Sequence, residues 1–496
     1  MSPFVELRAH SNYSFLQGAS FPFELAERAA QLEMPALGLT DAGGVYGAVK
    51  FLQVCRELGV KPVLGAEIDI GGEPLAMIAR TRRGWSNLCR IASFAHREQP
   101  KGEARTDLAT VAERRADLFF ISPPAKRLPE LQDALGRENV FVELSHHLRA
   151  EDDLRLEQAI EVAARHRAPA VATNLPRYHD RARRPLHDVV TAIRNRATLD
   201  EVRGLLHPNS ELVLKAGDEL HPDLRRRDHS WEIAQACDVE LDFQDVRFPG
   251  FQVPAGETPF SYLYNLCQQG ARERYRPMTS RVARRLQTEL EVIEKTGLAE
   301  FFLINWDLMR YAKEHGVPGQ GRGSAADSIV AYVLGITRVD PIEHNLLFER
   351  FLHEEMKTTP DIDIDFSSAH REEVIQYIYD RYGWERTGMV CNVVTFRPRM
   401  AIRQVGKALG FPAELIDKLA RSVDRWFAED VAASALQELQ PSSLNSETWL
   451  RFLDLCREIQ GFPRHLSIHV GGMLVTGEPL VDIVPVEPAT MPGRVV

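Results

Sequence analysis

The chain has 496 residues, of which 44% are hydrophobic and 26% charged, and its formal net charge is −10. This composition is typical of soluble globular protein and predicts about three or four domains. No apolar run approaches the ~18 residues of a membrane span, and the six cysteines form no Cys-x-x-Cys pair, which excludes a membrane protein, a zinc ribbon and a disulfide framework. The acidic charge argues against unspecific coating of nucleic acid, and the N-terminus lacks an export signal, so we expect a cytoplasmic protein.

The first 240 residues alternate short apolar strands with helical stretches. Strands are expected at residues 36–40, 63–70, 75–79, 119–121, 140–144 and 170–173, and helices at 46–58 and 154–166. This alternation predicts a βα-layered or barrel-like domain. The segment 247–256, which contains proline and glycine, is expected to be a linker.

After the linker, the pattern changes to larger helical blocks. Residues 260–313 and 399–460 are expected to be mostly helical, with a glycine-rich turn and an acidic strand between them. The last 30 residues are expected to be β-rich, with strands at 473–476 and 481–486.

The acidic strand, residues 360–366, is the most informative segment. Side chains of a strand alternate between its two faces, so Asp361, Asp363 and Asp365 project from one side while apolar residues project from the other. Carboxylates gathered in this way suit Mg²⁺, which predicts a metal-dependent phosphoryl-transfer site. The alternative is an acidic, solvent-facing edge strand.

A glycine-rich segment, residues 319–328, opens a helix that is expected to continue through residue 332. Glycines allow close approach to a phosphate, free N–H groups at a helix start bind anions, and Arg322 could add a bidentate contact. The segment matches neither a P-loop nor a dinucleotide fingerprint. A tight turn is the alternative, but the acidic strand that follows favours a triphosphate site.

Basic residues cluster twice, first in the set Arg272, Arg274, Arg276, Arg281, Arg284 and Arg285 and then in the set Arg397, Arg399, Arg403 and Lys407. Positions 399, 403 and 407 share one helix face. Such rows are usually solvated surface, but the proximity of the second set to the acidic strand favours phosphate contact.

Several long motifs resemble the C-family bacterial replicative polymerases, the DNA polymerase III alpha subunits, and in particular their error-prone branch. They are G-R-G-S-A-A-x-S at 321–328, L-L-F-E-R-F-L at 346–352, P-D-I-D-I-D-F at 360–366, the stretch 395–410 and R-H-L-S-I-H-V-G-G at 464–472. The resemblance covers nearly the whole chain.

The resemblance implies site residues. Asp361 and Asp363 match two of three catalytic metal ligands, and Asp365 is not counted among them. Gly323 and Ser324, with Arg322 beside them, match the triphosphate-binding loop, and Arg350 matches an arginine near the incoming nucleotide. Asp327 departs from the family pattern and places an extra negative charge near that loop.

The first third resembles the PHP domain of these polymerases, which in its active form is a metal-binding distorted βα barrel. Four ligand positions of that domain remain here, at His10, Asp41, Glu67 and His147. Others are replaced, and Arg8 and Arg177 bring positive charge where cations would lie. We therefore expect a structural role in preference to metal-dependent hydrolysis.

The resemblance implies an α/β multidomain fold. A PHP domain is expected at 1–240, the first part of a polymerase-β-like nucleotidyltransferase palm at 241–394, a helical thumb at 395–468 and an incomplete palm return at 469–496. The family's third catalytic aspartate is expected beyond Val496, so the palm is expected to be truncated.

The expected function is template-directed DNA synthesis from dNTPs with Mg²⁺, error-prone and linked to DNA repair and damage tolerance by translesion synthesis. Expected partners are primer–template DNA, dNTPs and, through a missing C-terminal part, a sliding clamp and accessory proteins. The alternatives are a PHP-type metal-dependent phosphoesterase and a catalytically inactive polymerase fragment.

Overall fold

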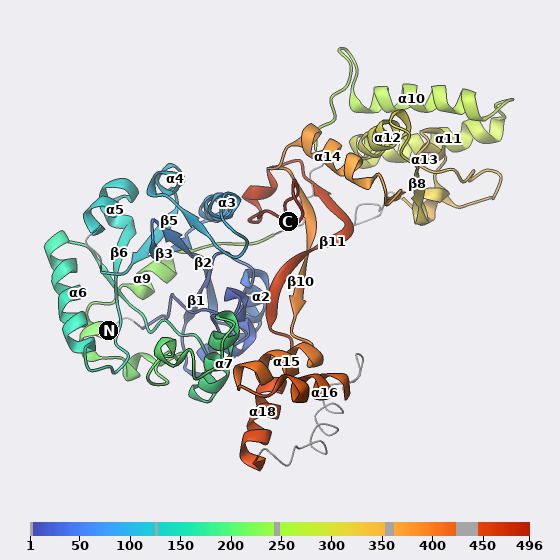
Figure 1. The fold of residues 1–496 in the computed structure, drawn as a ribbon. Coiled ribbons are helices and arrows are strands. Elements are labelled where there is room, and N and C mark those ends of the chain that lie inside the picture. Colours follow the sequence, from blue (N-terminus) through green and yellow to red (C-terminus); the bar gives the residue numbers. More distant parts are fainter. Residues whose placement is uncertain (1–2, 125–126, 243–248, 353–361, 423–444) are drawn as a thin grey trace. The chain divides into compact units, whose positions relative to one another are not determined.

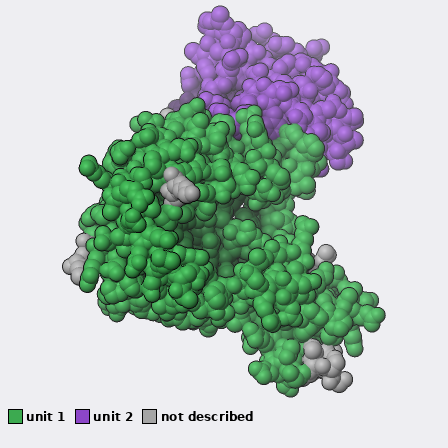
Figure 2. Space-filling model, turned by 60° about the vertical axis from the view of Figure 1, so that its left-hand side comes forward, with its two compact units in different colours: residues 1–243, 389–472, 480–496 green, residues 244–388, 473–479 purple. Residues whose placement is uncertain are grey.

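The computed structural model describes residues 3–124, 127–242, 249–352, 362–422 and 445–496. The chain forms two compact units, coloured separately in Figure 2. Unit 1 consists of residues 1–243, 389–472 and 480–496, and unit 2 of residues 244–388 and 473–479. The names palm and thumb, and the boundaries given to them, stay predictions, although the segment 395–468 that we expected to be a thumb lies within unit 1.

Unit 1 is built around a seven-stranded mixed sheet. Its strands are β1 (Ala36–Ala42), β2 (Lys61–Ile70), β3 (Glu73–Ala79), β4 (Arg105–Thr106), β5 (Leu118–Ser122), β6 (Val140–Leu144) and β7 (Ala170–Ala172). The order is β1-β2-β3-β5-β6-β7, and β4 pairs with β2. β3 is antiparallel to both of its neighbours, and the other pairs are parallel. The strands expected within the first 240 residues are all present.

Helices surround this sheet (Figure 1). They are α1 (Pro22–Gln31), α2 (Ala48–Leu58), α3 (Arg82–Arg97), α4 (Leu108–Glu113), α5 (Leu128–Leu135), α6 (Asp152–His166), α7 (Arg184–Arg194), α8 (Pro222–Arg226) and α9 (Ser230–Ala236). The central strands β5 and β6 are buried along their whole length, which explains their continuous apolar sequence. Met77 and Ile78 show the alternation, because they belong to two different apolar clusters on either side of the sheet.

The two ends of the sheet, β1 and β7, are joined by an irregular segment and not by a ladder between them. The Gly38 amide donates to the Glu6 carbonyl over 2.7 Å, and Ala9 forms an isolated bridge with Leu39. On its other side the same segment reaches Pro176, whose carbonyl accepts from the His10 amide over 3.0 Å. The expected distorted barrel is therefore a curled, incompletely closed sheet.

Unit 1 also contains α15 (Pro398–Ala408), α16 (Ala413–Ser422) and α18 (Ser446–Glu458). The apolar faces of α15 and α18 share a buried cluster with α7, which includes Val189, Ile193, Ile402, Val405 and Phe452. The described parts of 399–460 thus form the expected helical block. β10 (Thr387–Thr395) and β11 (Pro463–Val475) pair with each other.

The strand predicted at 481–486 is wrong, because this segment forms the short 3-10 helix η8 (Leu480–Asp482) followed by irregular chain. Side chains of α3 occupy carbonyls that a sheet ladder would use. Trp85 Nε1 donates to the Ile483 carbonyl and Ser86 Oγ to the Asp482 carbonyl, each over 2.8 Å. Pro485 has no N–H group to donate.

Unit 2 is mainly helical. Its elements are α10 (Pro259–Arg274), α11 (Ser280–Thr296), α12 (Ala299–Glu314), β8 (Gly319–Arg322), η6 (Gly323–Asp327), α13 (Ile329–Val333), η7 (Phe348–Arg350), β9 (Asp363–Phe366) and α14 (Arg371–Tyr382). Leu263, Leu290, Phe302 and Val330 are among the residues of its buried core. In the part of the chain that the structure describes, no helix has the length and apolar character needed to cross a membrane.

Candidate functional site

The acidic strand pairs directly with the glycine-rich segment. β8 and β9 are antiparallel, with Arg322 opposite Asp363 and Gln320 opposite Asp365. Residues directly opposite each other in such a pair project to the same face. The sequence could not establish this pairing, which brings the expected phosphate-binding segment against the expected metal ligands.

The expected alternation of β9 is confirmed for the residues that the structure describes. Asp363 and Asp365 are exposed, whereas Ile364 and Phe366 are half-buried. Phe366 packs against a small apolar cluster formed with α12 and α14. Asp361, the other predicted catalytic residue, lies outside the described residues.

Arg322 lies against the two exposed carboxylates. Its Nε is 3.1 Å from Oδ2 of Asp365 and 4.0 Å from Oδ2 of Asp363. Asp365, to which the resemblance assigns no role, is thus the nearer of the two carboxylates to Arg322. Because all three side chains are more than half exposed, this ion pair can open at little cost.

The carboxylates of β9 fit a hard cation such as Mg²⁺, which takes oxygen ligands and retains several waters. No cluster of three or more His, Cys, Asp or Glu side chains among the described residues is arranged to hold a metal ion. Asp363 is thus one candidate ligand, and Asp361 is its predicted partner outside that part of the chain.

The glycine-rich turn differs from its prediction in one respect. The expected single helix through residue 332 is divided into η6 and α13 by Ser328, which has extended backbone angles and whose Oγ accepts from the Ala331 amide. Gly323 has a φ of 65°, a conformation that glycine adopts without strain. Ser324 follows it within η6, so the two residues expected to bind triphosphate form a tight turn directly after Arg322.

A buried carboxylate lies beneath this turn. Glu289 of α11 is fully buried and accepts hydrogen bonds from Ser328 Oγ and from the backbone amides of Ile329 and Val330, over 2.8, 3.2 and 3.3 Å. Burial raises the pKa of the Glu289 carboxyl to about 7, although these hydrogen bonds and the charge of Arg285 oppose that increase.

Arg285, one turn earlier on α11, connects the two segments expected to contact the nucleotide. Its Nε donates to Glu289 over 2.8 Å, and its Nη2 donates to the carbonyls of Asp327 and Leu346 over 3.2 and 3.1 Å. Leu346 leads into η7, which carries the exposed Arg350.

Sequence reasoning missed Glu289 and treated Arg285 only as part of a charge cluster. A signal was present, because Glu289 lies between Leu286, Leu290 and Ile293 on the apolar face of α11. An acid on the core-facing side of an amphipathic helix needs buried partners, and the sequence does not show where they come from.

A second cluster of acids lies inside unit 1, at the positions expected from the PHP resemblance. Arg8 is 2% exposed and forms ion pairs with both Glu67 and Glu143. Burial raises the pKa of the Glu67 carboxyl, but the neighbouring His10, Arg8 and Arg177 side chains hold it well below its usual range.

His10 is fully buried beside this group. Arg177 donates a hydrogen bond to its Nδ1, and its Nε2 is 3.5 Å from Glu67. Burial and the charge of Arg177 lower the pKa of His10 to about 4. The ring is therefore neutral near pH 7, and the arginine already uses the nitrogen lone pair that a metal would need.

The other remaining ligands are also occupied. Asp41 accepts hydrogen bonds from Ser11 and Ser14, and burial raises its pKa to about 6. His147 donates from Nε2 to the Asn174 carbonyl over 2.9 Å. Each of the four remaining side chains is thus held by protein groups, and the structural role expected for this site stays a prediction.

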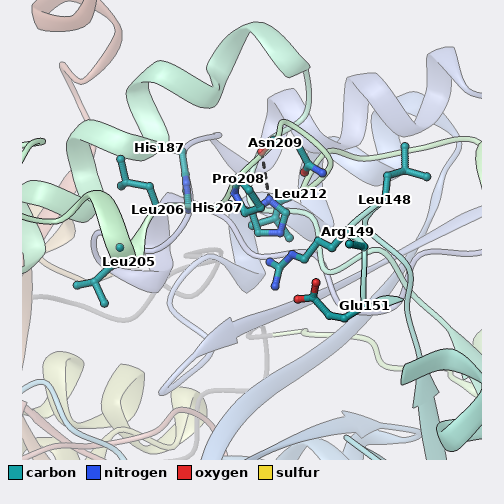
Figure 3. Close-up of a pocket in the computed structure, with 12 residues that line it drawn as sticks. Leu148, Arg149, Glu151, His187, Leu205, Leu206, His207, Pro208, Asn209 and Leu212 are labelled. Carbon is teal, nitrogen blue, oxygen red and sulfur yellow. Dashed lines mark hydrogen bonds between the residues drawn. The ribbon is translucent and has the colours of Figure 1, made fainter. Parts of the chain in front are cut away.

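Unit 1 also contains a separate pocket of about 790 Å³, which is not lined by the acidic clusters described above. Figure 3 shows that His187, His207, Asn209 and Arg149 approach it, with Glu151 as its one acidic side chain among the residues drawn. Its lining contains neither the PHP positions nor the acidic strand.

The predicted DNA-binding residues Arg397, Arg399, Arg403 and Lys407 are all exposed, and the last three lie on α15 opposite its buried apolar face. Nη2 of Arg403 is 3.3 Å from Asp417 of α16. The row is thus accessible to a phosphate backbone.

The curled sheet of unit 1 thus encloses acids and a histidine that lie against Arg8 and Arg177. Residues 6–168 match the model of the PHP domain, and residues 261–496 match that of the bacterial DNA polymerase III alpha NTPase domain. Both matches agree with the resemblance of the sequence motifs to the bacterial DNA polymerase III alpha subunits.

Curated relatives are similar in sequence to almost the whole chain. An error-prone DNA polymerase of Alkalilimnicola ehrlichii is 38% identical over 99% of this chain and 49% of its own length. Those of Pseudomonas aeruginosa and Mycobacterium tuberculosis are 38% and 36% identical over 100% and 99% of this chain and 49% and 47% of their own. The chain spans about half the length of the curated relatives it matches.

Among solved structures, an amidohydrolase from Chromobacterium violaceum is similar over 34% of this chain and 86% of its own, with 16% identity and a TM-score of 0.25. A likeness this low carries no argument about function.

Proposed function

We propose that this chain supplies nucleotide-binding and catalytic residues for template-directed, error-prone DNA synthesis. The observation that carries the proposal is the β8–β9 pairing, which places Arg322 and the Gly323 turn beside Asp363. The similarity to relatives named error-prone DNA polymerases also supports the proposal.

The proposed reaction is attack of a primer 3′-hydroxyl on the α-phosphate of a dNTP, with pyrophosphate leaving. Asp363, with Asp361, would hold Mg²⁺, which when bound favours deprotonation of the hydroxyl and offsets charge on the leaving phosphates. Arg322 and the turn at Gly323 and Ser324 bind the triphosphate, and Arg350 approaches it from η7. Because Arg322 is paired with Asp365 in the free protein, an entering triphosphate exchanges one anion for another at the same guanidinium.

The remaining parts of the proposal follow from this assignment. Residues 241–394 and 469–496 correspond to the palm, and residues 395–468 to a thumb whose exposed row of Arg397, Arg399, Arg403 and Lys407 contacts primer–template DNA. Synthesis past damaged DNA, a cytoplasmic location, and binding of a sliding clamp and accessory proteins belong to the same proposal.

We do not propose a PHP-type phosphoesterase activity. Arg8 and Arg177 lie against the acid and histidine that would be ligands, and a permanent buried cation excludes a metal ion from the same oxygen atoms.

Primer extension with Mg²⁺ and dNTPs, measured alongside binding of Mg·dATP to the chain with a dideoxy-terminated primer–template, tests the function. We expect Asp363→Asn to lower extension and nucleotide affinity at least about a hundredfold, since it removes a metal ligand. Asp380→Asn, an exposed acid of α14, is the matched control and should change neither. Absence of both extension and nucleotide binding in the unmodified chain contradicts the proposal.

A further inference from the structure

The turn expected to bind triphosphate consists of two short helical segments. η6 contains five residues and α13 five, and the extended Ser328 separates them. Helices this short are marginal by themselves, because nucleating a helix costs more than its first hydrogen bond returns. Something outside the turn must hold residues 323–330 in one conformation if its amides are to point at a phosphate.

Glu289 supplies that support through both of its oxygens. Oε1 accepts from Arg285 Nε over 2.8 Å and from the Ile329 amide over 3.2 Å. Oε2 accepts from Ser328 Oγ over 2.8 Å and from the Val330 amide over 3.3 Å. Each oxygen therefore receives one backbone N–H group, and a side-chain amide could not serve both, because its NH₂ group would face a donor.

Arg285 extends the same connection to the opposite side of the site. Its Nη2 donates to carbonyls of both Asp327, the last residue of η6, and Leu346, just before η7. The guanidinium also lies over the Phe348 ring, with its central carbon 5.8 Å from the ring centre. One arginine thus joins the segments that carry Gly323 and Arg350.

We propose that Glu289 and Arg285 are positioning residues for nucleotide binding, which set the turn at 323–328 relative to the segment at 346–350 so that both can contact one triphosphate. This inference rests on the proposed function and assigns to it two residues of α11 that lie outside its motifs. Neither side chain touches the nucleotide; their effect passes through the backbone that they hold.

The central experiment compares Glu289→Gln with Glu291→Gln, an exposed acid of the same helix. Mg·dATP is titrated into the chain bound to a dideoxy-terminated primer–template, and affinity for the same DNA alone is measured in parallel. At pH 8, where the Glu289 carboxyl is mostly ionised, we expect Glu289→Gln to weaken dATP binding roughly tenfold, the effect of one charged hydrogen bond, and to change DNA affinity less than about twofold. Glu291→Gln should leave both unchanged.

Hydrogen exchange of a peptide covering residues 323–333 tests the mechanism independently. Faster exchange of this peptide in Glu289→Gln, with the rest of unit 2 unchanged, supports the inference. Arg285→Lys, which keeps the charge but cannot reach all three acceptors together, should lie between the two variants in dATP affinity. A loss of protection throughout unit 2, or a parallel loss of DNA affinity, shows a general folding defect and overturns the positioning role.

The failure of this inference can be told apart from failure of the proposed function. If the unmodified chain binds dATP and Arg322→Ala weakens it, but Glu289→Gln does not, the positioning role is wrong and the function stands. If the unmodified chain binds no dATP with primer–template present, both are wrong.

Discussion

The two acidic clusters of this chain have similar chemistry and opposite environments. In unit 1, Glu67 and Glu143 are enclosed with Arg8, which both carboxylates contact. In unit 2, Asp363 and Asp365 are exposed and share Arg322 at 4.0 and 3.1 Å. Water screens the charges of the second cluster, so its carboxylates stay ionised and accessible without a bound cation. Buried carboxylates need a permanent cation beside them. The comparison teaches that burial decides whether a group of acids is available for binding.

Arg8→Met is expected to have the largest effect on stability. Removing the guanidinium leaves two buried carboxylates without their cation, and we expect the free energy of unfolding to fall by roughly 3–5 kcal/mol. Urea unfolding measures the change. Arg105→Met is the control, because Nη2 of the exposed Arg105 is 3.2 Å from the half-buried Asp69, and loss of this solvent-accessible pair should cost less than about 1 kcal/mol. Equal effects of the two variants would contradict the assignment.

A second prediction concerns pH and the neutral state of His10. Its pKa is about 4 in the folded protein and ordinarily 6.5, so between these values the unfolded chain binds more protons. Stability contributed by neutral His10 is therefore present above pH 6.5 and is lost as the pH falls towards 4. Relative to His10→Gln, the unmodified chain should lose up to ~3 kcal/mol over that window.

Urea unfolding at pH 7, 6 and 5 measures this difference between the two proteins. The comparison with a variant is necessary because Asp41, whose pKa is raised to about 6, contributes a pH dependence of opposite sign. His344→Gln, an exposed histidine of unit 2, is the control. A difference that does not change with pH would show that the pKa of His10 in the folded protein lies near its ordinary value of 6.5, and would contradict the prediction.

The smallest expected effect is that of Asp365→Asn in the exposed cluster. Because the side chains of Asp365 and Arg322 are 66% and 62% exposed, loss of their ion pair should change the free energy of unfolding by less than about 1 kcal/mol. Urea unfolding of Asp365→Asn and Arg8→Met under the same conditions compares the two losses of stability. A loss of unfolding free energy as large as that of Arg8→Met would mean that Arg322 has a structural role and is not available to bind a ligand.

The sequence could predict those features that depend on local pattern. The strands of the first 240 residues and the alternation of Asp363 and Asp365 follow from residue type and spacing, whereas the positions of Arg8 and Arg177 at former ligand sites were implied by the family resemblance. What it could not predict depends on distant partners. Residues 481–486 look like a strand, but Trp85 binds one of their carbonyls. The position of Glu289 on the apolar face of α11 calls for a buried partner, but the sequence does not show that this partner is Ser328, 39 positions away.

The return of residues 480–487 to α3 and the start of α2 has a consequence for how this chain acquires its structure during synthesis. Arg90 Nη2 contacts Asp482 over 2.9 Å, and Tyr46 donates to Glu487 over 2.8 Å, contacts that span 392 and 441 positions of sequence. Contacts of such separation form late and slow the search for the native state. The first 243 residues therefore leave the ribosome with the Trp85 region uncovered, and unit 1 is complete only after nearly five hundred codons have been translated. Until then, that surface of the nascent chain is open to chaperone binding and to incorrect contacts.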